Sequence, residues 1–272
     1  MNGILAVNHF LTGEKYTTLH SHLVESAKKC GINLKIKTNL ELACENAKAD
    51  FVLFWDKDIN IAKRLEKSGL PVFNSADSIA KCDDKALTYI ELENIVKQPK
   101  TLISPKCYFE VDMSEFVDKA IDILGFPLVF KECFGSFGFQ VYLCNTPADI
   151  YSHITDRPFI LQEFISESTG TDKRLEIVDG RCASCARREN KNDFRSNVTN
   201  GGTMTSCTPS KYEIDTAVKA CEVLGLTFAG VDILDDGSVC EVNSNAHIIN
   251  IMDSTGVDIA PLIFDAIKRK IK

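Results

Sequence analysis

The chain has 272 residues, 44% hydrophobic and 25% charged, a composition typical of a globular protein with two or three packed domains. Its net charge of −7 argues against nucleic acid or an anionic membrane as the main partner, although a local basic site can still hold phosphates. No apolar run approaches the ~20 residues that span a bilayer, and residues 1–10 lack the features of a signal peptide. Eleven scattered cysteines predict reduced thiols in a cytoplasmic protein.

The first third of the chain alternates strand and helix patterns. Apolar or alternating runs predict strands at residues 3–8, 34–39, 50–55 and 71–74. Amphipathic runs that end in glycine predict helices at residues 17–31 and 60–69. Strands separated by helices are typical of a parallel α/β sheet. One or two further helices, opened by Ser75, are expected over residues 75–94, so the first domain is predicted to be residues 1–95.

The middle of the chain changes character. It predicts strands at residues 101–105, 126–132 and 159–165 and a helix at residues 113–125. Residues 133–141 form a glycine-bearing turn followed by another apolar strand. We therefore expect a second domain at residues 96–165 and a third at residues 166–272.

The last third opens with two strands joined by Asp179-Gly180, a strong hairpin signal. Residues 187–202 are polar and end in two glycines, which indicates either a functional loop or a disordered tip. A helix at residues 210–225 precedes a second hairpin at residues 229–243, and a helix with a cationic end follows at residues 259–272.

Cys182 and Cys185 form the one CxxC pair, on the second strand of the first hairpin. Residues three apart on a strand point to opposite faces. The two thiols are therefore expected to be small buried side chains that do not share a metal.

The turn Asp236-Gly237 fixes the register of the second hairpin if it is a two-residue turn. That register predicts an apolar face with Val231, Ile233, Cys240 and Val242, in which Ile233 lies opposite Cys240. A slip by one residue would mix this set with polar side chains, so the hydrophobic pattern supports the register.

The other face of this hairpin carries Asp232 directly opposite Glu241, with Asn243 one step further along. Two facing carboxylates repel each other unless a cation lies between them. Carboxylate and amide oxygens suit Mg²⁺ or Mn²⁺ rather than zinc. The ribbon alone leaves two interpretations open, a metal site and a solvated polar face.

Lysines and glycines indicate a phosphate site. Lys131 ends a strand, and Gly135, Ser136 and Gly138 follow it in a turn. Backbone N–H groups at glycines approach anionic oxygens closely, so a phosphate clamp is expected here, with a simple β-turn as the alternative. The residue order of a Walker loop is absent. Lys85 is a second candidate cation or, alternatively, a solvated helix lysine.

Arg187, Arg188 and Arg195 lie within nine residues of an acidic protein. They suggest binding of phosphate or carboxylate groups, with a charged solvent loop as the alternative. No Ser-His-Asp or Cys-His arrangement is evident. Of the five histidines, only His9 and His247 fall where a substrate is expected to reach.

These pieces together resemble an ATP-grasp carboxylate–amine ligase of the RimK-type α-L-glutamate ligase family. The resemblance covers roughly residues 75–260, through KECFGSFG, LQEFISESTGTDKR, DFRSNVTNGG, AGVDIL, CEVNSN and TGVDIA in the family's order. It implies an ATP-grasp fold of the α/β class, preceded by a Rossmann-like parallel α/β domain at residues 1–95. Residues 96–165 would form a lid subdomain with the glycine loop, and residues 166–272 a subdomain with the metal site.

The resemblance also implies site residues. Nucleotide-binding roles fall on Lys85, Lys131, Gly135, Ser136, Gly138, Gln162, Glu163, Phe164, Ile165, Asp172, Arg195, Ser196 and Asn197. Residues 135–138 would be a mobile loop over the phosphates, and residues 162–165 a hinge strand that reads the adenine. Catalytic roles fall on Arg174, Arg188 and Arg195. Asp232, Glu241 and Asn243 would bind two Mg²⁺ or Mn²⁺ ions.

The implied reaction has two steps. A substrate carboxylate attacks the γ-phosphate of ATP to give an acyl phosphate and ADP, and an amine then displaces phosphate. Catalysis is positioning and charge neutralisation without an enzyme nucleophile. Many family members follow the metal-binding asparagine with a Ser-Pro-Gly-type turn, whereas this chain has residues 244–247, Ser-Asn-Ala-His. The residues that form the wall of the amine site, and the identity of the acceptor substrate, are therefore left undecided by the sequence.

Several alternatives stay open from the sequence. The substrates are expected to be a small-molecule or peptide carboxylate and an amine, with no nucleic acid or membrane partner, and a homo-oligomer stays open. Other ATP-grasp ligases, such as a glutathione-synthetase-like or dipeptide ligase, are one alternative. A nucleotide-binding protein without ligase activity is another, and a metal-binding structural domain is a third.

Overall fold

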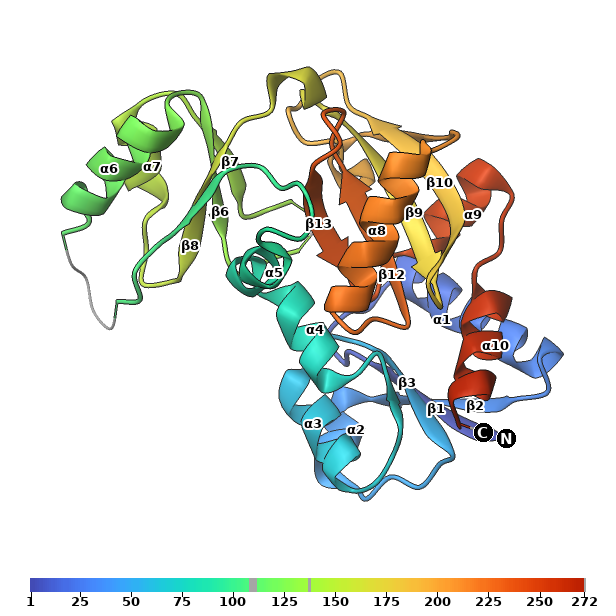
Figure 1. Cartoon of the computed structure of the whole chain (residues 1–272). Helices are drawn as coiled ribbons and strands as arrows, with labels where there is room; N and C mark the ends of the chain where they lie inside the picture. The colour runs from blue at the N-terminus through green and yellow to red at the C-terminus, as the bar shows by residue number, and fades with distance from the viewer. Residues whose placement is uncertain (108–111, 137, 272) are drawn as a thin grey trace.

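Three β-sheets organise the computed structural model, which describes residues 1–107, 112–136 and 138–271 (Figure 1). Their strand orders are β2-β1-β3-β4, β5-β8-β6-β7 and β11-β10-β9-β12-β13. Figure 1 shows the second sheet with α6 and α7 standing to one side of the third sheet, and the first sheet below it. Among the described residues, no helix is both long and apolar enough to cross a membrane.

The first sheet is parallel, as the alternation of strands and helices predicts. Its strands are β1 (Asn2–Val7), β2 (Asn33–Thr38), β3 (Phe51–Trp55) and β4 (Val72–Phe73). One face is covered by α1 (Glu14–Lys29) and α10 (Ala260–Ile271), the other by α2 (Asn39–Cys44) and α3 (Ile59–Lys67). β3 is buried along its whole length because helices cover both faces.

The second sheet is antiparallel and lies beyond two short helices. α4 (Ala76–Asp83) and α5 (Lys85–Leu92) occupy the segment where one or two helices were expected, and Ser75 caps α4. The strands are β5 (Thr101–Ile103), β6 (Leu128–Glu132), β7 (Val141–Cys144) and β8 (Phe159–Glu163). The helices packed on this sheet are α6 (Ser114–Leu124) and α7 (Pro147–His153). α7 was not expected, although its capping box at Thr146 is visible in the sequence.

The third sheet has one apolar and one polar face. Its strands are β9 (Thr171–Val178), β10 (Arg181–Glu189), β11 (Thr203–Ser206), β12 (Phe228–Ile233) and β13 (Val239–Asn243). The apolar face packs against α8 (Lys211–Val223), while α9 (Ile248–Thr255) contacts β10 and β11. Short 3₁₀ turns lie at Ser166–Ser168 and Val198–Asn200. The polar face carries buried charges from β9, β10 and β12.

The second hairpin differs from the prediction next to its turn. Asp232 does pair with Glu241, but Ile233 pairs with Val239 rather than with Cys240. A β-bulge between Asp232 and Ile233 accounts for the change, because it inserts one extra residue into β13. The expected position of Cys240 on the apolar face is therefore wrong; the cysteine is half-buried and points into a cavity described below.

The first hairpin contains a second bulge, between Cys182 and Ser184. The extra residue brings Cys182 and Cys185 onto the same side, where both pack against the apolar cluster under α8. The expectation that the two thiols point to opposite faces is therefore wrong. Cys185 instead lies 3.3 Å, sulfur to sulfur, from Cys207, and all eleven cysteines are free thiols.

Asn74 joins the first sheet to the third. Its side chain is 1% exposed; its Nδ2 donates to the carbonyls of Phe228 and Ser244, and its Oδ1 accepts from Thr227 N. These contacts hold the start of β12 and the end of β13 against the carboxyl edge of the first sheet. The segment after β13 is thereby placed beside the ends of β1 and β3.

Candidate active site

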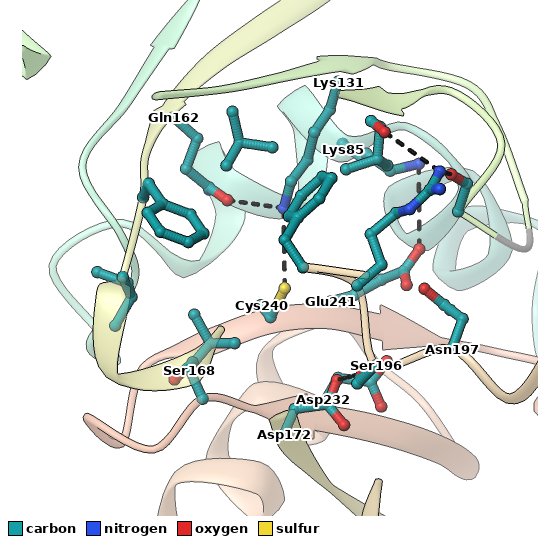
Figure 2. A pocket seen from close by; sticks show the side chains of 18 of the residues that line it. Lys85, Lys131, Gln162, Ser168, Asp172, Ser196, Asn197, Asp232, Cys240 and Glu241 are labelled. Carbon is teal, nitrogen blue, oxygen red and sulfur yellow. Dashed lines mark hydrogen bonds and ion pairs between the residues drawn. The ribbon is translucent and has the colours of Figure 1, made fainter. Parts of the chain in front are cut away.

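A first cavity of about 120 Å³ lies between the second and third sheets (Figure 2). Every residue that the sequence assigns to nucleotide binding lines it: Lys85, Lys131, Gly135, Ser136, Gly138, Gln162, Glu163, Phe164, Ile165, Asp172, Arg195, Ser196 and Asn197. Arg188, Asp232 and Glu241 line it as well. Segments from five parts of the chain therefore converge on one site.

Two lysines, the buried Lys131 and the partly buried Lys85, supply the positive charge at one end of the first cavity. Lys131 Nζ donates to Gln162 Oε1 at 2.7 Å and lies 3.7 Å from Cys240 Sγ. Lys85, the first residue of α5, donates to the Gly135 carbonyl at 3.3 Å and lies 4.0 Å from Glu241 Oε1. Figure 2 shows Lys131 reaching down between Gln162 and Cys240. Burial lowers the pKa of Lys85, and Glu241 opposes that shift.

The other end of the cavity is more apolar. Phe164 and Ile165 follow β8, and the ring of Phe164 meets Phe194 edge to face at 6.4 Å between centroids. Glu163 lines the cavity too, but its Oε1 accepts from Lys100 N at 2.7 Å. The arrangement offers an aromatic and aliphatic wall for a base and a cationic end for phosphates.

The glycine turn touches the polar loop after β10. Arg195 Nη1 donates to the carbonyl of Gly138, and its guanidinium also pairs with Asp193 at 2.7 Å. Gly138 has φ +74, and a Cβ there would lie 2.8 Å from Asn197 Oδ1, so both backbone and space require glycine. Phe137, which belongs to the predicted loop, lies outside the described residues.

Four charges form a buried cluster on the polar face of the third sheet. Arg174 lies opposite Asp232 across β9 and β12, and Arg188 lies opposite Asp172 across β9 and β10. Arg174 binds Asp232 through two contacts of 2.6 and 2.7 Å, and Arg188 bridges Asp172 and Asp232. Ser196 Oγ also donates to Asp172. Although burial alone would raise the pKa of Asp232, Arg174 and Arg188 hold it below its usual value.

The predicted metal ligands lie on this same face. Asp232 is opposite Glu241, and Asn243 lies two residues further along β13. The donors are all oxygens, which suits Mg²⁺, and Asn243 Nδ2 is buried without a hydrogen-bond partner. The described residues contain no group of three His, Cys, Asp or Glu side chains arranged for a metal; this set instead combines two carboxylates with an amide. The residues present therefore fit the ion in donor chemistry.

A second cavity, of about 380 Å³, opens beside the first. Ser136, Arg188, Asn197 and Glu241 line both cavities. The remaining walls come from α1, from the ends of β1 and β3, and from the segment between β13 and α9. Arg174 and Asn243, which the sequence placed with the nucleotide and metal, line this second cavity rather than the first.

A match to a protein-family model decides the family. The RimK-like ATP-grasp domain matches residues 82–267. The chain belongs to this family. The resemblance seen in the sequence is confirmed, and so is the prediction of an ATP-dependent ligase that forms carbon–nitrogen bonds.

Relatives of this RimK-like chain include proteins with named products. It is 30% identical to the uncharacterized protein MG012 of Mycoplasma genitalium, over 83% of this chain and 85% of that protein. It is 32% identical to N-acetylaspartylglutamate synthase A of Homo sapiens, over 77% of this chain and 55% of the synthase. It is also 32% identical to a probable alpha-L-glutamate ligase of Maridesulfovibrio salexigens, over 77% and 71%. The chain therefore spans about half the length of the human synthase.

Solved structures share the fold. D-alanine–D-alanine ligase from Bacillus anthracis superposes with a TM-score of 0.76 at 17% identity, over 98% of this chain and 96% of that one. A RimK domain ATP-grasp protein from Sphaerobacter thermophilus gives 0.72 at 20% identity, over 97% and 98%. The predicted α/β ATP-grasp fold is confirmed.

The RimK-like chain departs from the sequence expectations at several residues. Arg187 lines neither cavity and instead pairs with Asp235, and Arg187 and Arg188 lie on β10 rather than in a loop. His9 is exposed and lines neither cavity, whereas His247 lines the second.

Sequence reasoning missed two residues of the second cavity, His20 on α1 and Asp56 after β3. Asp56 directly follows a buried parallel strand, and ligands of such sheets gather at the carboxyl ends of strands, so this signal was available. His20 carried no such signal because it lies on a helix.

Proposed function

We propose that this RimK-like enzyme joins a substrate carboxylate to an amine through an acyl phosphate, with L-glutamate as one of the two substrates. The observation that carries the proposal is the shared wall of the two cavities, made by Ser136, Arg188, Asn197 and Glu241. The wall lies at the cationic end of the first cavity, where phosphates are expected. A carboxylate in the second cavity would thus face the γ-phosphate.

The first cavity would bind ATP by its two ends. Phe164 and Ile165 offer surface for the base, while Lys85 and Lys131 face the phosphates. Gly135, Ser136 and Gly138 would close over the phosphates with backbone N–H groups. The residue roles implied by the resemblance are part of this proposal, as is the division into domains at residues 1–95, 96–165 and 166–272.

Asp232, Glu241 and Asn243 would hold two Mg²⁺ or Mn²⁺ ions. Bound divalent ions supply charge neutralisation for the phosphates. Arg174 and Arg188 fix the carboxylate of Asp232 by direct ion pairs. Arg188 and Arg195 are oriented by Asp172 and Asp193, so their charges are already in place when phosphate leaves the acyl carbon.

The choice of glutamate rests on the named relatives, a probable alpha-L-glutamate ligase and a synthase whose product contains glutamate. We also propose a cytoplasmic location, which the eleven free thiols support. The similarity covers only 55% of the human synthase, so the partner substrate is left to experiment.

The test is an ADP-release screen with purified enzyme, Mg²⁺ and ATP over pooled carboxylates and amines, with mass spectrometry of products. We expect ADP release to require L-glutamate and to yield an amide heavier by one glutamyl residue. ADP release with another acid but not with glutamate would refute glutamate as a substrate and would still support ligase activity. Binding of Mg·ATP with no pair that stimulates ADP release would favour a nucleotide-binding protein instead.

A further inference from the structure

Asp56 is a buried carboxylate with one unsatisfied oxygen. The residue is 4% exposed and lines the second cavity. Its Oδ1 accepts from Asn8 Nδ2 at 3.0 Å and from Lys57 N at 2.8 Å. Its Oδ2 is buried and has no hydrogen-bond partner among the described residues. A buried carboxylate with an unpaired oxygen costs folding free energy, so a ligand that completes it is the natural reason for its presence.

Among the described residues, no ion pair to the Asp56 carboxylate is found within 4.0 Å. The adjacent Lys57 directs its ammonium group to Asp83 at 2.8 Å and to Ser136 Oγ at 3.2 Å. Burial raises the pKa of Asp56, and the nearby carboxylates of Asp58 and Asp83 add to the shift. The surroundings of Asp56 therefore favour an incoming positive charge.

The position in the fold is one where parallel α/β sheets bind ligands. β1 has β2 on one side and β3 on the other, so the strand order reverses between β1 and β3. Asn8 follows β1 and Asp56 follows β3 directly. Ligands bind outside the carboxyl ends of strands at such a switch point.

Other residues that line the second cavity also have unsatisfied groups. Six buried side-chain atoms lack a partner in the described part of the chain, and three of them belong to residues that line the second cavity: Asp56 Oδ2, Asn243 Nδ2 and His247 Nδ1. The three residues supply a carboxylate acceptor, an amide donor and an imidazole to the lining of this cavity. A ligand with both a cationic and an anionic group matches this arrangement better than an apolar one.

We propose that Asp56 is the specificity-determining residue that holds the ammonium group of a free amino acid in the second cavity. An ammonium group brings the positive charge and the donor that Oδ2 lacks. An N-acylated acid has no positive charge, keeps a single amide N–H and adds an acyl group, so it satisfies the buried carboxylate less well and the cavity disfavours it. The inference rests on the proposed ligase function, because it names the class of one of that site's substrates.

The test is titration calorimetry on the full chain with Mg²⁺ and a non-hydrolysable ATP analogue. The probes are L-glutamate, the other common amino acids and the N-acetyl form of each. We expect at least one free amino acid to bind at least about 10-fold more tightly than its N-acetyl form. Asp56→Asn should weaken the binding of that amino acid by about 10- to 100-fold and leave the affinity for the ATP analogue unchanged.

Asp58→Asn is the matched control, because Asp58 caps α3 through Ile61 N at 3.1 Å and lines neither cavity. It should leave amino-acid affinity unchanged. Asn at position 56 can still accept from Asn8 and Lys57, so Asp56→Asn should melt at the wild-type temperature or above it. A lower melting temperature with equal losses of affinity in both variants would mean a structural role and overturn the proposal.

Two further results would overturn it: wild-type affinity in Asp56→Asn, or no preference for any free amino acid over its N-acetyl form. Failure of the ligase function is a separate result. In that case the amino acid binds through Asp56 while no combination of substrates releases ADP. Conversely, the enzyme could release ADP with its substrates while Asp56→Asn binds the amino acid with wild-type affinity. That result would support the ligase function and refute the role of Asp56.

Discussion

The two cavities differ in how their polar groups are satisfied. In the first, most charged groups are paired within the protein: Lys131 with Gln162, Arg188 with Asp172, and Arg195 with Asp193. One lining atom, Gln140 Oε1, is buried without a partner. In the second, three such atoms belong to lining residues. The first cavity is organised before its ligand arrives, whereas the second has more buried groups that no described protein group completes.

The difference matches the division of labour in the proposed reaction. A nucleotide site performs the same task with every substrate, so its charges can be fixed in advance by neighbours. A substrate site must discriminate, and unpaired buried groups discriminate strongly because a wrong ligand leaves them unpaired. Substitutions at either cavity can therefore test this contrast.

Lys131→Met should cause the largest loss. The variant keeps a long side chain but removes a buried positive charge from the phosphate end of the first cavity. We expect kcat/KM for ATP to fall by about 10²- to 10³-fold. Steady-state ADP release measures it, with Lys119→Met as control because Lys119 is exposed on α6. An unchanged kcat/KM for ATP would break the assignment of this end to phosphates.

Asp232→Asn should reduce stability as well as activity. It leaves Arg174 buried beside a neutral partner, and breaking a buried ion pair from one side costs about 3–5 kcal/mol. Urea denaturation measures the free energy of unfolding. The double variant Asp232→Asn/Arg174→Met should recover part of that stability without recovering activity, since the proposed metal ligand is still absent. Full stability in the single variant would show that the cluster is not a single electrostatic unit.

Glu176→Gln tests an unpaired group behind the second cavity. Glu176 is 3% exposed, its Oε1 has no partner, and burial raises its pKa to about 7 from 4.5. The folded chain therefore binds more protons than the unfolded chain between these pH values, so stability falls as pH rises through this window. Above it, Glu176→Gln should be more stable than wild type by on the order of 3 kcal/mol, and below pH 4.5 the two should be equal.

Glu213→Gln should change the free energy of unfolding in the opposite direction to Glu176→Gln. Although burial alone would raise its pKa, Lys173 and Ser210 hold the pKa of Glu213 below its usual value. Glutamine at this position should therefore lower stability at neutral pH, and the difference should shrink as the pH falls through the lowered pKa of Glu213. Urea denaturation across pH measures both variants. If the free energies of unfolding of the two variants depended on pH in the same way, Glu176 would have a partner in solution.

Sequence periodicity was sufficient for much of the fold, and the resemblance to a known family was sufficient for the residues of the first cavity. Strands separated by glycine-ended helices predicted the parallel sheet, and stretches shared with a known family identified all thirteen nucleotide-binding candidates that line the first cavity. Both successes depend on local patterns. The second cavity combines residues from α1, β3 and the segment after β13, and no local pattern links them.

The errors in register share one cause. A β-bulge adds one residue to a strand, and every side chain beyond it changes face. One bulge displaced Cys240 from the core, and another placed Cys182 and Cys185 on the same side. Alternating hydrophobicity could not reveal either bulge, because cysteine is tolerated both in a core and at a polar wall.

Cys240→Ser tests the corrected register and should have the smallest effect. In the predicted register Cys240 would be a core residue, and serine there would cost about 1–3 kcal/mol through an unsatisfied hydroxyl. In the structure it is half-buried at the wall of the first cavity, 3.7 Å from Lys131 Nζ, where a hydroxyl can accept a hydrogen bond. The free energy of unfolding should therefore change by less than about 1 kcal/mol. Cys221→Ser is the comparison, because Cys221 is 2% exposed under α8 and should show the full cost. If both variants lost the same free energy of unfolding, the register without the bulge would be correct and Cys240 would not lie at the cavity wall.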